Sequence, residues 1–372
     1  MNENNQNSDI NNIAPVSLDL AKEDRAASKP VDAAQLKSPE ELLKNPRKAE
    51  VEVVQAVAPG MEKASILKLF GDELTAEEFI INPAIGREHE IKQLILAILT
   101  PEKSAILVGP PGSGKTAVVE GIAYIMQKGD IPEALKGYKI IKVNSTALVG
   151  TIESEGQEQQ KMNVLIDEIR GASKLILFID EIHTLIGSSN DGPMDFANML
   201  KPALGRGDIK VIGATTNSEF EQYVLTDRAF LRRFLMINID EPDQDMSTLI
   251  VMGTMKKIEK ITGVTMDYDD FLKEKVSRFV VEMTDHRKRL VGVSSHYPDI
   301  SLALLANIYS YALYDNRDKV TMLDISKAIV NCQSIYDDSL RKEILRFKKE
   351  FENFLERENV NVEVPESLLR DI

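Results

Sequence analysis

The sequence predicts an α/β fold, in which a parallel sheet is covered by helices on both faces, followed by a small all-helical domain. Short apolar runs at residues 105–108, 139–143 and 175–179 alternate with stretches whose apolar residues recur every three or four positions. That alternation is typical of buried parallel strands joined by helices. A glycine-rich loop at residues 109–116 follows the first run, and helical periodicity alone continues after residue 241.

Composition narrows the class of protein. A chain of 372 residues can bury a sizeable core. The 45 Lys and Arg against 59 Asp and Glu give a net charge of −14, which disfavours non-specific nucleic-acid binding but leaves a local basic patch open. The single cysteine, Cys332, forms no intrachain disulfide. No apolar run reaches membrane-spanning length and the amino terminus does not resemble a signal peptide, so we expect a cytoplasmic protein without membrane contact.

The first 64 residues differ from the rest of the chain. They are rich in Asn, Asp, Glu, Lys, Ala and Pro, and the first aromatic residue of the protein is Phe70. Such a segment buries too little apolar surface to offset the entropy of ordering it. Ser38 and Glu41 have the spacing of a helix N-terminus, so partner docking is one interpretation. A largely disordered, solvated tail is favoured over it.

The first apolar strand runs into a loop with the pattern Gly-x-x-x-x-Gly-Lys-Thr. An amphipathic helix is expected before this strand, from residue 88, and another after the loop, ending at Gly129. In a loop of this kind, backbone N–H groups and the positive end of a helix surround phosphate oxygens. Lys115 would reach the β- and γ-phosphates, and Thr116 would ligate Mg²⁺. The predicted phosphate-binding residues are Gly109, Pro110, Pro111, Gly112, Ser113, Gly114, Lys115 and Thr116.

The apolar run at residues 175–179 ends in Asp180 and Glu181. Both carboxylates are expected at the carboxyl edge of the sheet, beside the phosphate loop. There Asp180 could hold Mg²⁺ through water, and Glu181 could polarise the attacking water. An acidic turn after a strand is common by itself. Together with the loop about sixty residues upstream, it predicts hydrolysis of ATP.

Two further groups of polar residues follow later strands. The strand at residues 210–213 is followed by Ala-Thr-Thr-Asn, which offers hydroxyl and amide groups at the same edge of the sheet. Arg232 and Arg233 precede an expected strand at residues 235–239. These arginines are either ordinary surface charges or include an arginine finger, which would stabilise the charge on the γ-phosphate of a neighbouring subunit.

Six sequence motifs resemble those of a known protein family. From about residue 65 to 299 the chain resembles the first ATPase ring of the Clp-type AAA+ chaperones, through NPAIGREHEI, VGPPGSGKTAVVEGIA, GDIPEALKG, LFIDEIHTLIG, DFANMLKPALGRGDIKVIGATT and FLRRF. The resemblance implies a P-loop AAA+ ATPase that uses ATP and Mg²⁺ and forms a homo-oligomer, most often a hexameric ring.

The resemblance also assigns roles to residues. It implies that Ile85 and Gly86 line the adenine pocket and that Thr216 senses the phosphate. Arg232 and Arg233 become the candidate trans-acting fingers. Pro298 opens the helix that packs over the nucleotide, and no arginine stands at the usual second-sensor position.

The domains expected from this resemblance are a tail (1–64), an α/β ATPase domain (65–240), a helical lid (241–336) and a C-terminal helix with its tail (337–372). Lid helices are expected at residues 246–261, 270–282, 298–314 and 322–332. The last helix, at residues 340–355, has a heptad-like apolar seam. We favour packing of this seam on the protein's own lid over an intermolecular coiled coil.

Departures from the family shape the expected function. We expect neither a folded substrate-collecting domain before the ring nor a second ring with its protease-docking loop, because the chain is too short. In the segment ALVGTIESEGQEQQ, Ser154 stands where the family has an aromatic pore residue, between Glu153 and Glu155. We therefore expect that general threading of polypeptides is weak or absent. We expect instead that the protein remodels or assembles one dedicated protein partner. The alternatives are an ATP-controlled oligomeric scaffold and a DNA-associated ATPase of a mobile element or replication machinery.

Overall fold

The chain divides into two units at residues 59 and 60, and only the second, Gly60–Ile372, contains described residues. The computed structural model describes residues 65–154, 157–186, 200, 204, 209–292 and 296–369, all of them in the second unit. The predicted N-terminal tail therefore lies outside the described residues. The predicted boundaries near residues 241 and 337 remain a prediction, because both fall inside the second unit.

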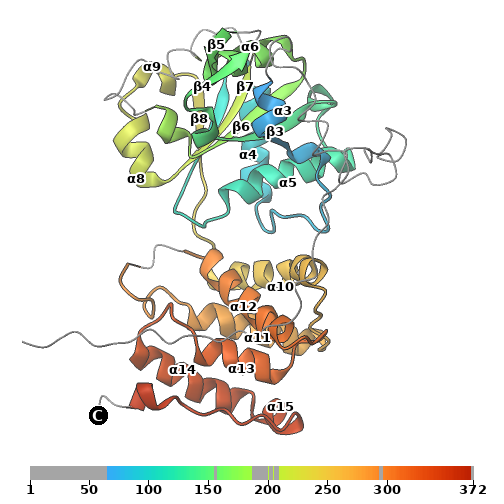
Figure 1. The fold of residues 1–372 in the computed structure, drawn as a ribbon, viewed down its shortest axis with the longest axis vertical. Coiled ribbons are helices and arrows are strands. Elements are labelled where there is room, and N and C mark those ends of the chain that lie inside the picture. The colour runs from blue at the N-terminus through green and yellow to red at the C-terminus, as the bar shows by residue number, and fades with distance from the viewer. Residues whose placement is uncertain are drawn as a thin grey trace, which may run out of the picture. The chain divides into compact units, whose positions relative to one another are not determined.

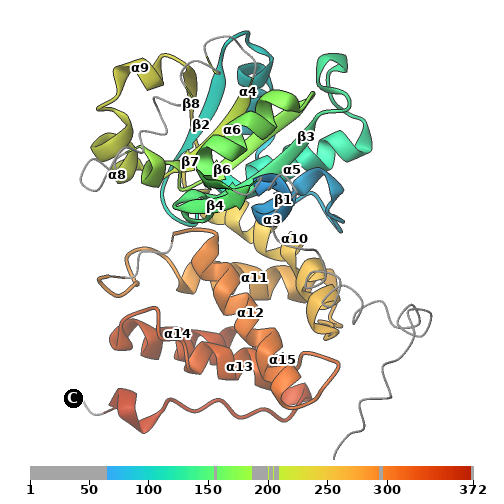
Figure 2. The same cartoon turned by 45° about the horizontal axis from the view of Figure 1, so that its top comes forward.

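Within the described residues, a six-stranded sheet forms the centre of the α/β part (Figure 1). Its strands lie in the order β1-β3-β6-β7-β2-β8 (Figure 2). The other five strands pair in parallel with one another, as predicted. The edge strand β1 (Gly71–Glu73) was not predicted and pairs antiparallel with β3. The parallel strands are β2 (Ser104–Val108), β3 (Lys139–Asn144), β6 (Leu175–Asp180), β7 (Lys210–Thr215) and β8 (Phe234–Asn238).

Helices cover both faces of the sheet, because successive side chains of a strand point to opposite sides. Ala105 and Leu107 of β2 belong to one buried cluster, and Ile106 and Val108 to another. The first cluster contains side chains of α4 (Glu88–Leu99) and α5 (Lys115–Lys128). The second contains side chains of α3 (Ile66–Phe70) and α6 (Lys161–Gly171) (Figures 1 and 2). The predicted fold class is therefore confirmed.

A hairpin of two short strands precedes α6. Strands β4 (Thr151–Ser154) and β5 (Gln157–Gln160) pair antiparallel, so residues 159 and 160 belong to the hairpin and the helix begins at Lys161. The remaining short elements are η1 (Leu74–Ala76), η2 (Glu133–Leu135), η3 (Ser145–Leu148), η4 (Ile182–Leu185), α8 (Asn217–Glu219), the π-helical η5 (Phe220–Val224), α9 (Arg228–Leu231) and η6 (Glu366–Leu369).

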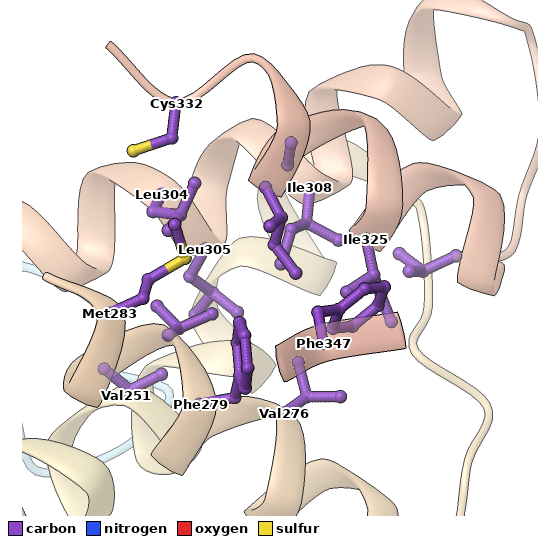
Figure 3. Close-up of a cluster of buried hydrophobic side chains, with 14 of the residues drawn as sticks. Val251, Val276, Phe279, Met283, Leu304, Leu305, Ile308, Ile325, Cys332 and Phe347 are labelled. Carbon is purple, nitrogen blue, oxygen red and sulfur yellow. The ribbon is translucent and has the colours of Figure 1, made fainter. Parts of the chain in front are cut away.

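The helices after residue 241, here called the lid, share one buried cluster (Figure 3). Asp243 and Asp269 cap the first two helices by accepting bonds from the backbone N–H groups of Met246 and Leu272. The helices are α10 (Gln244–Thr262), α11 (Asp270–Met283), α12 (Asp299–Tyr314), α13 (Met322–Val330), α14 (Asp337–Glu350) and α15 (Glu352–Arg357). None of the helices in the described ranges combines the length and apolar content that a bilayer crossing requires.

The predicted last helix is divided into α14 and α15 at Phe351, so the prediction of one continuous helix is wrong. Its seam nevertheless packs on the lid. Leu340, Ile344, Phe347 and Phe351 are buried in the lid cluster. The ring of Phe347 lies edge-on to Phe279 at a centroid distance of 5.4 Å (Figure 3), and the ring of Phe351 lies edge-on to Phe279 at 5.7 Å. These side chains are consequently unavailable for an intermolecular coiled coil.

Candidate functional site

A cavity of ≈ 550 Å³ lies at the carboxyl edge of the sheet. It is bordered by the phosphate loop, by the ends of β6 and β7, by residues that precede α4, and by α10 and the start of α12. Of the predicted site residues, those lining it are Ile85, Pro111, Gly112, Ser113, Gly114, Lys115, Thr116, Asp180, Glu181, Thr216 and Pro298, whereas Gly86, Gly109, Pro110, Arg232 and Arg233 do not line it.

Two loop glycines have backbone conformations that other residues rarely adopt. Gly114, at φ 94°, caps the N-terminus of α5, and Gly112 has φ 74°. A Cβ atom on Gly112 would lie 2.7 Å from Cβ of Asp299, the first residue of α12. The loop and the lid helix α12 therefore approach each other so closely that only glycine fits.

Lys115 is held across the phosphate loop. Its Nζ donates hydrogen bonds to the carbonyl oxygens of Gly109 at 2.9 Å and Pro110 at 2.8 Å. Burial lowers the pKa of Lys115, and the nearby carboxylates of Asp180 and Glu219 oppose that shift. The amine thus stands inside the loop that would surround the phosphates, facing carboxylates on the other side of the cavity.

Thr116 and Asp180 form the part of the cavity suited to a divalent cation. The Thr116 hydroxyl donates a 3.2 Å hydrogen bond to Asp180 Oδ2, and Lys142 Nζ lies 3.8 Å from the same oxygen. Among the described residues, no group of three or more His, Cys, Asp or Glu side chains could hold a metal. Beside a phosphate site, Mg²⁺ keeps several water and phosphate ligands, so it needs only one or two oxygens from the protein. The donor set therefore fits that ion.

Glu181 follows β6 with φ 52°, a left-handed conformation that is uncommon outside glycine. Its backbone N–H donates to Asp180 Oδ1 at 3.1 Å, and its carbonyl accepts from the Thr184 hydroxyl at 3.0 Å. The side chain is exposed and borders the cavity. The turn thus directs Asp180 and Glu181 to the same cavity although they are neighbours in sequence.

The end of β7 places a network of hydrogen bonds at the cavity. Glu219 Oε2 accepts from the Thr216 backbone N–H at 3.0 Å and from the Thr215 hydroxyl at 3.2 Å. His183 Nδ1 lies 3.1 Å from both Glu219 Oε2 and Thr215 Oγ1. Burial would raise the pKa of Glu219, but the hydrogen bonds from Thr216 and Thr215 together with the nearby His183 outweigh it and hold that pKa below its usual value. The charged carboxylate of Glu219 therefore fixes the end of β7, where the predicted sensor Thr216 lies.

Sequence reasoning missed Glu219, although Thr216 and Glu219 have the spacing of a capping box, which the structure contains. It also missed Glu120 and Lys257, which line the cavity from α5 and α10. Burial raises the pKa of Glu120, and the charge of Lys257 counters part of that shift. Glu120 follows Thr116 by four residues, which places both on one face of α5 and could have revealed it.

The predicted adenine side of the cavity joins the α/β part to the lid. Ile85 lines the cavity and packs so closely on α10 that a Cβ on Gly253 would lie 2.3 Å from its Cδ1. Gly86 does not line the cavity and lies against Met246. Pro298 lines the cavity as the N-cap residue of α12.

Arg232 and Arg233 lie away from this chain's own cavity. Arg232 is exposed after α9, and its carbonyl accepts a hydrogen bond from Lys103. Arg233 Nη1 lies 3.7 Å from Glu102 Oε2. Neither guanidinium therefore contributes to the phosphate site of the same chain.

Comparison with known proteins agrees with this arrangement. Residues 105–274 match the AAA family, described as the ATPase family associated with various cellular activities. The chaperone protein ClpB of Porphyromonas gingivalis is 43% identical over 183 residues, 48% of this chain and 21% of the relative. The ATP-binding subunit ClpE of the Clp protease of Bacillus subtilis is 33% identical over 326 residues, 83% of this chain and 45% of the relative.

Among solved structures, a complex of Hsp104 from S. cerevisiae with ADP has a TM-score of 0.60 at 30% identity, covering 77% of this chain and 49% of that one. The chain thus spans less than half the length of these relatives. Membership of the AAA family implies ATP binding. The matched phosphate loop, acidic strand end and lid therefore identify this chain as an AAA ATPase related to the Clp-type chaperones ClpB, ClpE and Hsp104.

Proposed function

We propose that this protein hydrolyses ATP at the cavity and uses the cycle to remodel or assemble a protein partner. The observation that carries the proposal is the 3.2 Å hydrogen bond from the Thr116 hydroxyl to Asp180, with Glu181 beside it. It joins the start of the phosphate-loop helix to the acidic end of β6, which is separated from β2 by one strand. Phosphoryl transfer needs these two groups at one position.

Each residue of the cavity has a distinct role in this proposal. Lys115 binds the β- and γ-phosphate oxygens, and Glu181 orients and polarises the attacking water. Thr216, whose backbone N–H is bound by Glu219, would sense the γ-phosphate from its place in the cavity lining. Thr116 and Asp180 would hold Mg²⁺, which neutralises charge on the phosphate oxygens.

Assembly into a ring would complete the site. Arg232 and Arg233 do not line this chain's own cavity, so either of them could stabilise a transferring phosphate only at the site of a neighbouring copy. We propose a homo-oligomeric ring of six copies, in which one of these arginines acts on the adjacent subunit.

The β4–β5 hairpin supports weak general threading. Ser154, at the position of the family's aromatic pore residue, is only 2% exposed, and Glu155 lies outside the described residues. Ile152 packs against the core, and the exposed side chains include Glu153 and Glu158, which stand directly opposite each other. An acidic hairpin offers little apolar surface to grip an unfolded chain. We infer a dedicated partner instead.

The nature of the partner can be tested directly. One solved relative is a complex of Hsp104 with casein, which makes a protein the favoured class. ATP turnover of the full chain would be measured with unfolded casein, with double-stranded DNA and with neither. Turnover that rises only with DNA and loses this response at high salt would refute the protein-remodelling proposal. Capture of protein by the Glu181→Gln variant with ATP, absent with ADP, would support it.

A further inference from the structure

We propose that Glu241 is a positioning residue that holds the start of α12 over the bound nucleotide. This inference rests on the proposed ATP site. It assigns a role at that site to a residue that does not itself line the cavity. Glu241 lies where the chain leaves β8 for the lid, and it contacts the two residues that precede Pro298.

The Glu241 carboxylate uses both of its oxygens for this purpose. Oε1 accepts a 2.8 Å hydrogen bond from the backbone N–H of Tyr297, and Oε2 lies 2.7 Å from Nδ1 of His296. Burial would raise the pKa of Glu241, but the hydrogen bonds from Tyr297 and His296, together with electrostatic attraction to His296 and Arg289, outweigh it and hold that pKa below its usual value. The carboxylate is therefore charged at neutral pH, which strengthens both contacts.

Tyr297 transmits this hold because its side chain is fixed as well. The ring is 5% exposed, and its hydroxyl donates a 2.5 Å hydrogen bond to the Val281 carbonyl. The guanidinium of Arg289 lies over the ring, 4.6 Å from its centroid. Arg289 also donates to the Thr284 carbonyl at 2.7 Å and lies 3.4 Å from Glu241 Oε1. The position of Tyr297 is thus set both by Glu241 and by the end of α11.

The next two residues reach the nucleotide site. Pro298 and Asp299 both line the cavity. A Cβ on Gly112 would lie 2.7 Å from Cβ of Asp299, so the start of α12 touches the phosphate loop. A change in the position of Tyr297 would therefore open or close the space around the phosphates.

A second connection returns from Glu241 to the same loop. Arg87 donates from Nη2 to the carbonyl of Asp240 at 2.8 Å and to the carbonyl of Ser113 at 2.9 Å. Asp240 is the neighbour of Glu241. These contacts form a closed circuit. Arg87 connects Ser113 to Asp240, and Glu241, the next residue, binds the backbone of Tyr297. Two residues further on, Asp299 lies against Gly112 of the phosphate loop. Within this circuit, Glu241 is the link between the two parts of the chain that flank the lid helices α10 and α11.

The test uses the full-length protein and a fluorescent ADP analogue whose release is followed after mixing with excess ATP. Glu241→Ala should speed release by at least about tenfold, because it removes charge-assisted contacts. His296→Ala removes one of these contacts at a 38% exposed side chain and should speed release less. Adding it to Glu241→Ala should have no further effect.

Two further variants separate positioning from general stability. Glu241→Gln keeps an acceptor for the Tyr297 N–H but loses the charge, so its release rate should be intermediate. Asp267→Asn breaks an exposed lid ion pair, 2.7 Å from Lys319 Nζ and remote from the cavity, and should leave release unchanged.

The outcomes distinguish this inference from the proposed function. Release at the wild-type rate in both Glu241→Ala and His296→Ala would overturn the inference. If Glu241→Ala does not fold, His296→Ala and Glu241→Gln decide the question by the same measurement. Failure of the wild-type protein to bind the analogue would instead overturn the proposed ATP site.

Discussion

The Thr116 hydroxyl and the Asp180 carboxylate, 64 positions apart in the chain, are joined by a 3.2 Å hydrogen bond at the carboxyl edge of the sheet. The two groups meet because β2 and β6 both run parallel toward this edge, separated only by β7. Open α/β sheets bind ligands at this edge.

Lys115 and Glu181 should separate nucleotide binding from turnover. Lys115→Ala removes the amine held across the phosphate loop and should abolish binding of a fluorescent ATP analogue. Glu181→Gln should retain binding and lower turnover by at least about a hundredfold, because only the water-polarising carboxylate is lost. Unchanged turnover in Glu181→Gln would remove Glu181 from its proposed role.

Asp180 should govern the response to Mg²⁺. Asp180→Asn should raise the Mg²⁺ concentration for half-maximal turnover by about 10- to 100-fold, since the carboxylate would hold the ion or its bound water. Nucleotide binding without Mg²⁺, measured in EDTA, should change little and serves as the control. An identical Mg²⁺ titration for wild type and variant would contradict the assignment.

The two arginines predict complementation between inactive subunits. If Arg232 or Arg233 acts on a neighbour, its alanine variant should bind ATP but lose turnover by about 10³-fold or more. Mixing that variant with Lys115→Ala should restore activity, because Lys115→Ala subunits still carry the arginine. Specific activity should also rise with protein concentration. Full activity of both single arginine variants would exclude a trans-acting role for either one acting alone.

The acidic hairpin predicts poor unfolding of ordinary substrates. The wild-type protein should hydrolyse ATP while unfolding a tagged fluorescent protein slowly or not at all. Glu153→Tyr places an aromatic ring at an exposed position of β4 and should increase unfolding. Glu153→Gln controls for loss of charge alone. Robust unfolding by the wild type would disprove weak threading.

The C-terminal helices should contribute strongly to stability. Phe351→Ala would remove a fully buried ring that packs against Phe279 and Phe347, at a loss of about 3–5 kcal/mol in the free energy of unfolding. Leu345→Ala in α14 is the matched control, since Leu345 is 51% exposed. Denaturant titration measures both. Equal losses for the two variants would mean that the seam does not pack as described.

The predictable part of this protein is the part encoded by neighbouring residues. Strands β2, β3, β6 and β7 begin within one residue of the positions that the sequence predicts. The central strands β2 and β6 are buried along nearly their whole length and therefore need apolar residues in succession. The phosphate loop needs glycine at Gly112 and Gly114 for local backbone reasons. Asp180 and Glu181 follow because a strand end carries its next residues to the sheet edge.

Tertiary structure alone decided contacts between distant segments. Arg87 binds a carbonyl 153 positions away, and Glu241 binds a backbone N–H 56 positions away. No periodicity in the sequence records either contact. The same holds for the burial of Ser154 and for the seam of α14, because the sequence pattern favours packing of the seam on the protein's own lid but is also compatible with an intermolecular coiled coil.

The sequence by itself therefore determined the α/β class, the phosphate loop and its acidic partner strand, because each depends on a few consecutive residues and on backbone geometry. Tertiary structure decided that Ser154 is buried, that Phe351 packs on Phe279, and that Glu241 connects to Tyr297. The physical reason is that burial and long-range hydrogen bonding depend on which surfaces meet when the whole domain packs, and a local pattern specifies only which face is apolar.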